Sequence, residues 1–136
     1  MKKSVVIPLI FLILIAGALI AFFTPKAFGK HLRPDEVDHI IVFDGNTGFG
    51  FTIDDREQIA YIVENLQSHP VRRVGISLGT TGYGFKITYV DSTDHAVIPV
   101  FLLNSPFSIR KDPFFYHCDG GLCFDYLKGI EDSFTN

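Results

Sequence analysis

VVIPLIFLILIAGALIAFF, residues 5–23, is the stretch that decides how this chain is organised. It carries no charged side chain, and a helix of this length rises about 28 Å, close to the thickness of a bilayer's hydrocarbon core. In lipid the backbone polar groups must bond within the segment, so a spanning run is helical. We therefore expect a transmembrane anchor at residues 5–23 that contacts the lipid bilayer, preceded by a basic cytoplasmic head at residues 1–4.

A cleaved signal peptide is the main alternative to this anchor. Lys2 and Lys3 followed by an apolar run are typical of secretory signals, and residues 27–29 have a small-x-small pattern that could be cleaved. The apolar core of a signal is usually about 7–15 residues long, which is shorter than this run. We expect a retained anchor, with a secreted domain as the alternative and a buried core helix as a weaker one.

The flanking charges bear on the orientation of the anchor. Lys2 and Lys3 favour a cytoplasmic N-terminus, whereas Lys26, Lys30 and Arg33 on the other side favour the opposite topology. A short charged head crosses a membrane only with difficulty. We therefore expect a single-pass protein of the cell membrane with its N-terminus inside and its C-terminal domain outside the cytoplasm.

The charge of the chain is unevenly distributed. The whole chain has a net charge of −3, but residues 31–136 contain all 15 acidic residues and only eight bases, a net charge of −7. An acidic surface repels phosphate backbones, so nucleic acid is not an expected partner.

Residues 24–38 are polar enough to predict a stalk or linker, and residues 39–136 then form one domain. Within that domain one helix is well marked, because Asp54 and Glu57 have the spacing of a capping box. Four apolar residues then recur at helical spacing, which places them on one face; they are Ile59, Ile62, Val63 and Leu66. His69 and Pro70 end the helix.

Most of the remaining domain has the patterns of β-strands. Residues 73–78 and 85–89 alternate between apolar and polar side chains, and residues 96–103 are apolar on both faces with Pro99 at a bulge or an edge. Two prolines predict a loop at residues 104–113. Residues 114–116 and 122–124 can form a last hairpin, although residues 124–134 can instead begin a closing helix.

An internal similarity adds to this layout. Residues 45–53 (GNTGFGFTI) match residues 79–87 (GTTGYGFKI), and an apolar strand pattern precedes both copies. We therefore expect two similar hairpins with the helix after the first. The predicted fold is α+β, a small, mostly antiparallel sheet in the order β-β-α-β-β-β-β, with one main helix packed on it and a possible C-terminal helix.

Two glycine-containing motifs are weak functional signals. A phosphate-binding loop needs a helix directly after the glycines, and here a strand follows both times. The sequence around Ser77 fits the G-x-S-x-G pattern of serine hydrolases, which requires a sharp turn from strand to helix. The alternation places Ser77 inside a strand, so we interpret this match as chance.

The cysteines are predicted to form a structural disulfide. Cys118 and Cys123 flank a glycine-containing turn, and a bridge there would indicate an oxidising compartment outside the cytoplasm. Their spacing differs from the C-x-x-C of thiol oxidoreductases. His117 and Cys118 are adjacent and would point to opposite faces of a strand, so we predict no metal site. Free thiols remain an alternative, and no cofactor is expected.

The function predicted from these features is a non-enzymatic accessory, binding or sensing module on the outer side of a membrane. This layout is similar to that of many small anchored bacterial proteins. Aromatic residues beside turns form the candidate binding surface, for which core packing is the simpler explanation; they are Phe49, Tyr83, Phe114, Phe115 and Tyr116. An immunity-type or inhibitor-type protein, or a small enzyme, is the alternative. No catalytic residue is predicted, and Asp54, Asp55 and His95 are the only ionisable residues that an enzyme reading suggests.

Overall fold

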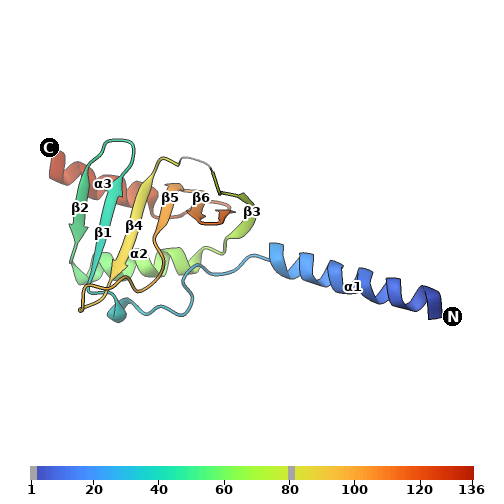
Figure 1. Ribbon diagram of the computed structural model, residues 1–136. Helices are drawn as coiled ribbons and strands as arrows, with labels where there is room; N and C mark the ends of the chain where they lie inside the picture. Colours follow the sequence, from blue (N-terminus) through green and yellow to red (C-terminus); the bar gives the residue numbers. More distant parts are fainter. Residues whose placement is uncertain (1–2, 80–81) are drawn as a thin grey trace.

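The structure, a computed structural model, describes residues 3–79 and 82–136. Its first element is α1 (Lys3–Phe23), a single helix that extends away from the rest of the molecule (Figure 1). The segment Val5–Phe23 is long and apolar enough to cross a membrane, a property that signal sequences share, and none of its most apolar window is buried. The predicted helix is therefore present, and its place in a membrane stays a prediction.

The remaining described residues form an antiparallel sheet of seven strands with helices packed against it, so the α+β class is confirmed. The spatial order of the strands is β2-β1-β4-β5-β6-β7-β3. The strands are β1 (His39–Asp44), β2 (Gly50–Ile53), β3 (Arg72–Ile76), β4 (Phe85–Val90), β5 (Phe101–Ser105), β6 (Ser108–Lys111) and β7 (Phe114–His117). The helices are α2 (Arg56–Ser68) and α3 (Phe124–Thr135), with a short 3-10 turn, η1 (Pro34–Glu36).

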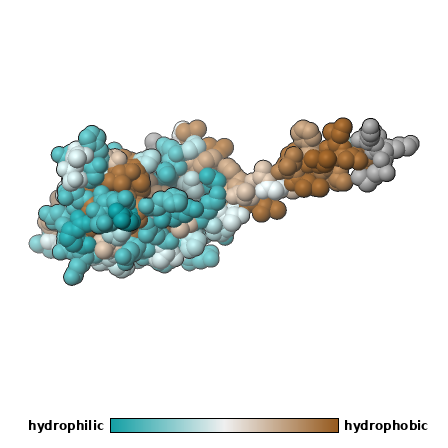
Figure 2. Space-filling view, turned by 90° about the horizontal axis from the view of Figure 1, so that it is seen from below, coloured by the Kyte–Doolittle hydropathy of each residue, from teal (hydrophilic) through white to brown (hydrophobic). Residues whose placement is uncertain are grey.

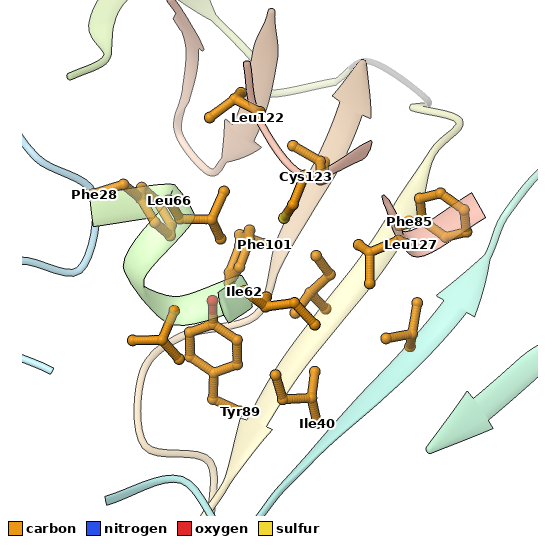
Figure 3. Packing of buried hydrophobic residues seen from close by; sticks show 14 of the residues in the cluster. Phe28, Ile40, Ile62, Leu66, Phe85, Tyr89, Phe101, Leu122, Cys123 and Leu127 are labelled. Carbon is orange, nitrogen blue, oxygen red and sulfur yellow. The ribbon is translucent and has the colours of Figure 1, made fainter. Parts of the chain in front are cut away.

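The core lies on one face of this sheet. Side chains that are paired across neighbouring strands, such as Ile40 with Tyr89 and Phe85 with Leu103, are all buried. They meet Ile62 and Leu66 of α2 and Leu127 of α3 in a single cluster (Figure 3). Residues on the other face, including Ile41, Phe43 and Lys86, remain exposed. The two-layer arrangement follows from strict alternation in the central strands.

The predicted helix at residues 54–66 is confirmed as α2, with a different cap. Asp55 is the N-cap residue, and its side chain accepts a hydrogen bond from the Gln58 backbone N–H at 2.9 Å. The assignment of the cap to Asp54 is therefore wrong. Two adjacent aspartates both satisfy the composition of a cap, and only the backbone geometry decides which one aligns with the free N–H groups.

Of the two hairpins predicted from the internal similarity, only the first is present. β1 pairs with β2 as expected, and Ile40 lies opposite Ile53. The second is wrong, because β3 pairs with β7 at the sheet edge while β4 pairs with β1 and β5 in the centre. Part of its predicted turn, residues 80–81, lies outside the described residues. The repeated letters therefore do not determine the pairing of the strands around them.

Three other predicted boundaries are corrected by the structure. Residues 104–113 are not a loop, since β6 lies between Pro106 and Pro113, which flank the strand without interrupting its ladder. Residues 122–124 do not form a strand, because Cys123 is the N-cap of α3, so the alternative of a closing helix is the correct one. β5 begins only at Phe101, after the irregular segment that contains Pro99.

The segment predicted as a stalk or linker is packed against the domain. Phe28, Leu32 and Val37 are buried in the core, and Lys26 pairs with Val71 through two backbone hydrogen bonds of 2.9 Å. Arg56 of α2 donates to the carbonyl groups of Val37 and other residues of this segment. The stalk prediction missed this packing because isolated apolar residues among polar ones give no periodic pattern. Each of them can still fill a gap at the border of a core.

Candidate functional site

The last turn of α1 contacts the domain at β3 and β7, and we call this region the junction. The Phe22 and Phe114 rings meet edge to face with their centroids 5.3 Å apart. The Arg73 guanidinium lies 4.5 Å from the centre of the Phe22 ring and 5.0 Å from that of Phe114, and its Nη1 donates to the Phe22 carbonyl at 3.1 Å. Cation–π contacts and a charge-assisted hydrogen bond thus link the helix to the sheet.

A cavity of about 160 Å³ opens on one side of this contact, and we call it the junction cavity. Its polar lining comes from Thr24, Lys26, Arg73 and Lys111, and Phe22 and Tyr116 are among its apolar lining residues. Within the described part of the chain, no carboxylate forms an ion pair with any of the three cations. Arg73 Nε is buried and has no hydrogen-bond partner there. The cavity is therefore lined by positive charge without a compensating carboxylate, and Arg73, one of its lining residues, keeps an unused buried donor.

An apolar pocket of about 250 Å³ shares two lining residues, Phe22 and Arg73, with the junction cavity. It continues along β3, where Val74 and Ile76 are 54% and 68% exposed, and Leu78, two residues after the strand, is 65% exposed. These three side chains are here called the junction patch. Figure 2 shows apolar surface gathered at the end of the domain that faces α1. Residues 73–78 were predicted as a half-buried strand, but β3 is an edge strand that leaves this apolar side uncovered.

The predicted aromatic surface is only partly assembled. Phe114 belongs to the junction and Tyr116 lines its cavity, whereas Phe115 lies 5.9 Å from the Arg110 guanidinium. Tyr83 is exposed in the segment before β4. Phe49 stacks on Phe51 and packs against the border of the core, so it belongs to a separate group of aromatic residues.

The two cysteines are free thiols in the structure, which does not contain the predicted disulfide. Cys118 contacts the carbonyl groups of Pro106 and Gly120 through its sulfur at 3.7 Å. The Cys123 side chain points into the core towards Phe101 (Figure 3), and burial raises its pKa to about 12. The hairpin that would have placed both sulfurs side by side is absent, since Cys123 begins a helix.

A buried ionic cluster that the sequence patterns did not indicate joins α3 to the first hairpin. Glu131 accepts hydrogen bonds from Thr47 Oγ1 at 2.9 Å and Lys128 Nζ at 2.6 Å. Lys128 Nζ is also 3.9 Å from Asp44, whose other oxygen accepts from Asn46. The hydrogen bond to Glu131 raises the pKa of Lys128. The only signal in the sequence was the three-residue spacing of Lys128 and Glu131, which is common on exposed helices.

The remaining candidate residues have local partners. Ser77 follows β3 instead of lying within it, is fully buried, and donates to Asp112 Oδ1 at 2.6 Å. That hydrogen bond, with a second from Arg110, lowers the pKa of Asp112. Asp55 caps α2 and Asp54 is exposed, while His95 lies in a turn organised by Asp91. Hydrogen bonds from Thr93 and His95 lower the pKa of Asp91.

Among these groups, the junction is the one place where unpaired cations, an unused donor and uncovered apolar surface meet. Its members come from four separate segments, so their proximity depends on the packing of α1 against β3 and β7. No protein-family model, curated protein or solved structure matches this chain.

Proposed function

We propose that this protein is a single-pass membrane protein whose small α+β domain acts outside the cytoplasm as a non-enzymatic accessory, binding or sensing module. The observation that carries the proposal is the uncovered apolar helix α1, of membrane-spanning length, joined to a folded domain only through its last turn. An apolar helix of this length without protein cover is stable in lipid and costly in water.

Retention of the helix is favoured over cleavage. Removal of residues up to 27–29 would take away Phe22, which packs on Phe114 and Arg73, and Lys26, which pairs with Val71. Cleavage after Gly29 would also remove Phe28, which is buried in the core. A signal sequence is removed from the mature protein and has no need of such contacts, whereas a permanent anchor gains a defined attachment from them.

The absence of a catalytic role is proposed from the partners of the ionisable groups. The two buried carboxylates, Asp44 and Glu131, are occupied by Asn46, Thr47 and Lys128. Ser77 and Asp112 bond each other at the end of β3. These groups hold elements together, so a role in binding fits the domain better than a role in general acid–base chemistry.

Topology is tested with single cysteines and a membrane-impermeant maleimide on intact cells. Ser92→Cys lies in an exposed turn of the domain, and Ser4→Cys lies in the basic head. We expect labelling of Ser92→Cys before lysis and of Ser4→Cys only after it, with the unmodified chain as a blank because its own thiols are buried. The reverse pattern would refute the orientation.

Retention is measured separately on the same cells. The protein should fractionate with membranes and keep its N-terminal residues in an intact mass measurement. A chain that begins after residue 27 and is found in the medium would establish the secreted alternative.

A further inference from the structure

We propose that the junction binds a membrane phospholipid, with the lipid phosphate in the junction cavity and an acyl chain against the junction patch. This inference rests on the proposed function, since it requires α1 to lie in a bilayer. It adds a ligand class and names the residues: Lys26, Arg73 and Lys111 for the phosphate, and Val74, Ile76 and Leu78 for the chain.

The chemistry of the cavity fits a phosphate. Three cations line it without a compensating carboxylate among the described residues, although the domain as a whole is acidic. Arg73 also keeps its buried Nε–H unpaired while Nη1 is already bonded to the Phe22 carbonyl. A guanidinium can donate two parallel hydrogen bonds to a phosphate, and lysines add charge without strict geometry. An oxygen of a phosphate would satisfy the unused Nε donor.

The position of the cavity along the membrane normal fits a lipid headgroup. Phe22 is next to the last residue of the apolar run, so it lies where the hydrocarbon core gives way to the headgroups when α1 spans the bilayer. Arg73 is bonded to that residue, and Lys26 follows it by four positions. Basic residues at this depth attract anionic lipids. The phosphate of the same leaflet therefore reaches the cavity without any movement of the domain.

The apolar half of the junction fits an acyl chain. The apolar pocket shares Phe22 and Arg73 with the cavity, so a phosphate site and an apolar surface adjoin, as the two parts of a phospholipid do. The junction patch lies on β3, an edge strand, and just after its end, and an uncovered apolar edge in water invites aggregation. Because β3 is the strand nearest to α1 (Figure 1), the bilayer that holds α1 is the surface best placed to cover it.

Contact with acyl chains is tested with the full-length chain in nanodiscs of phosphatidylcholine and phosphatidylglycerol. The chain contains no Trp, so Ile76→Trp supplies a single fluorescent probe in the patch, and Tyr61→Trp on the exposed side of α2 is its control. Lipids brominated on the acyl chain should quench the fluorescence of the Ile76→Trp variant and leave that of the Tyr61→Trp variant unchanged. Protection of the patch probe from iodide without quenching by brominated lipid would show that a protein chain covers β3, and it would overturn the proposal.

The phosphate site is tested by native mass spectrometry of the full-length chain in detergent, titrated with phosphatidylglycerol. Lys26→Gln with Lys111→Gln should weaken binding of one lipid on the order of tenfold, because each basic residue near an anionic headgroup strengthens lipid binding several-fold. Lys30→Gln with Lys86→Gln removes the same charge away from the cavity and should leave binding unchanged. Equal losses in both variants would refute a specific site.

Two further measurements distinguish a failure of the lipid assignment from a failure of the membrane anchor. Inorganic phosphate that binds alone with similar affinity, with no lipid quenching of the Ile76→Trp variant, would identify a site for free phosphate and overturn the lipid assignment. Flotation of the chain with vesicles tests the anchor independently. A chain that does not float refutes the proposed function, whereas a chain that floats without quenching or lipid retention refutes only this inference.

Discussion

At the scale of single residues, burial controls the chemistry of Cys123. The thiol lies in the core and its pKa is raised to about 12, because loss of solvation disfavours the thiolate. At pH 8 only about one molecule in ten thousand then carries the reactive thiolate. We expect alkylation of Cys123 in the folded chain at least about a hundredfold slower than that of the exposed Ser92→Cys, measured by mass spectrometry under identical conditions.

The same shift has a direct consequence for stability. Since the pKa is higher in the folded state, the contribution of the protonated thiol is complete below the ordinary cysteine pKa of about 8.5. It is lost as the pH rises from there through 12.

Denaturation without reductant should expose both cysteines to alkylation. Failure of the denatured, unreduced chain to label would show a disulfide and contradict the free thiols.

At the scale of elements, Glu131 attaches α3 to the turn between β1 and β2. Its carboxylate is buried and bonds Thr47 and Lys128, which are 84 and 3 residues away in sequence. Glu131→Ala removes an acceptor for both, although Lys128 is exposed enough to turn towards water. We expect the free energy of unfolding to fall by about 2 kcal/mol, measured with urea on the full-length chain in detergent.

Asp132→Ala is the matched control for this substitution. It removes the neighbouring acid, which is exposed and 3.9 Å from the same Lys128 nitrogen. Exposed ion pairs contribute little, so its effect should be within about 0.5 kcal/mol. Equal losses in the two variants would mean that the buried hydrogen bonds do not hold α3 in place.

Elements defined by local signals were predictable from the sequence, and those defined by distant pairing were not. α1 follows from an uninterrupted apolar run, and α2 from four apolar residues at helical spacing. The β1–β2 hairpin follows because its partners are close in the chain. β3 has a local pattern as good as that of β4, yet its partner is β7, about 40 residues later. No pattern within β3 carries information about that choice.

The candidate site was predictable only in part for the same reason. Phe114 and Tyr116 stand out as aromatic residues beside a turn, and both lie at the junction. Lys26, Arg73 and Lys111 are ordinary surface cations when read singly. Their grouping depends on Lys26 pairing with Val71 and on the order β6-β7-β3 at the sheet edge, which brings Lys111 of β6 near Arg73 of β3.

At the scale of the whole molecule, Arg73 sets how the domain is oriented relative to α1. Its guanidinium contacts Phe22, Phe114 and Tyr116, and its hydrogen bond to the Phe22 carbonyl satisfies one of the last free acceptors of the helix. A positively charged group near the C-terminus of a helix is also favoured by the helix dipole. The Arg73 side chain thus links the long helix α1 to the sheet.

We therefore expect Arg73→Ala to loosen the domain without unfolding it. Spin labels at Ala16→Cys in α1 and Ser133→Cys in α3 report their separation in nanodiscs by pulsed electron paramagnetic resonance, and the buried native thiols stay unlabelled. The distance distribution should be narrow with Arg73 and clearly broader with Arg73→Ala. Arg72→Ala removes the same charge from an exposed position that has no contact with Phe22, so it should keep the narrow distribution. If the distance distributions of both variants remain narrow, the aromatic contact of Phe22 with Phe114 is sufficient to orient the domain. The junction patch then faces the bilayer without help from Arg73.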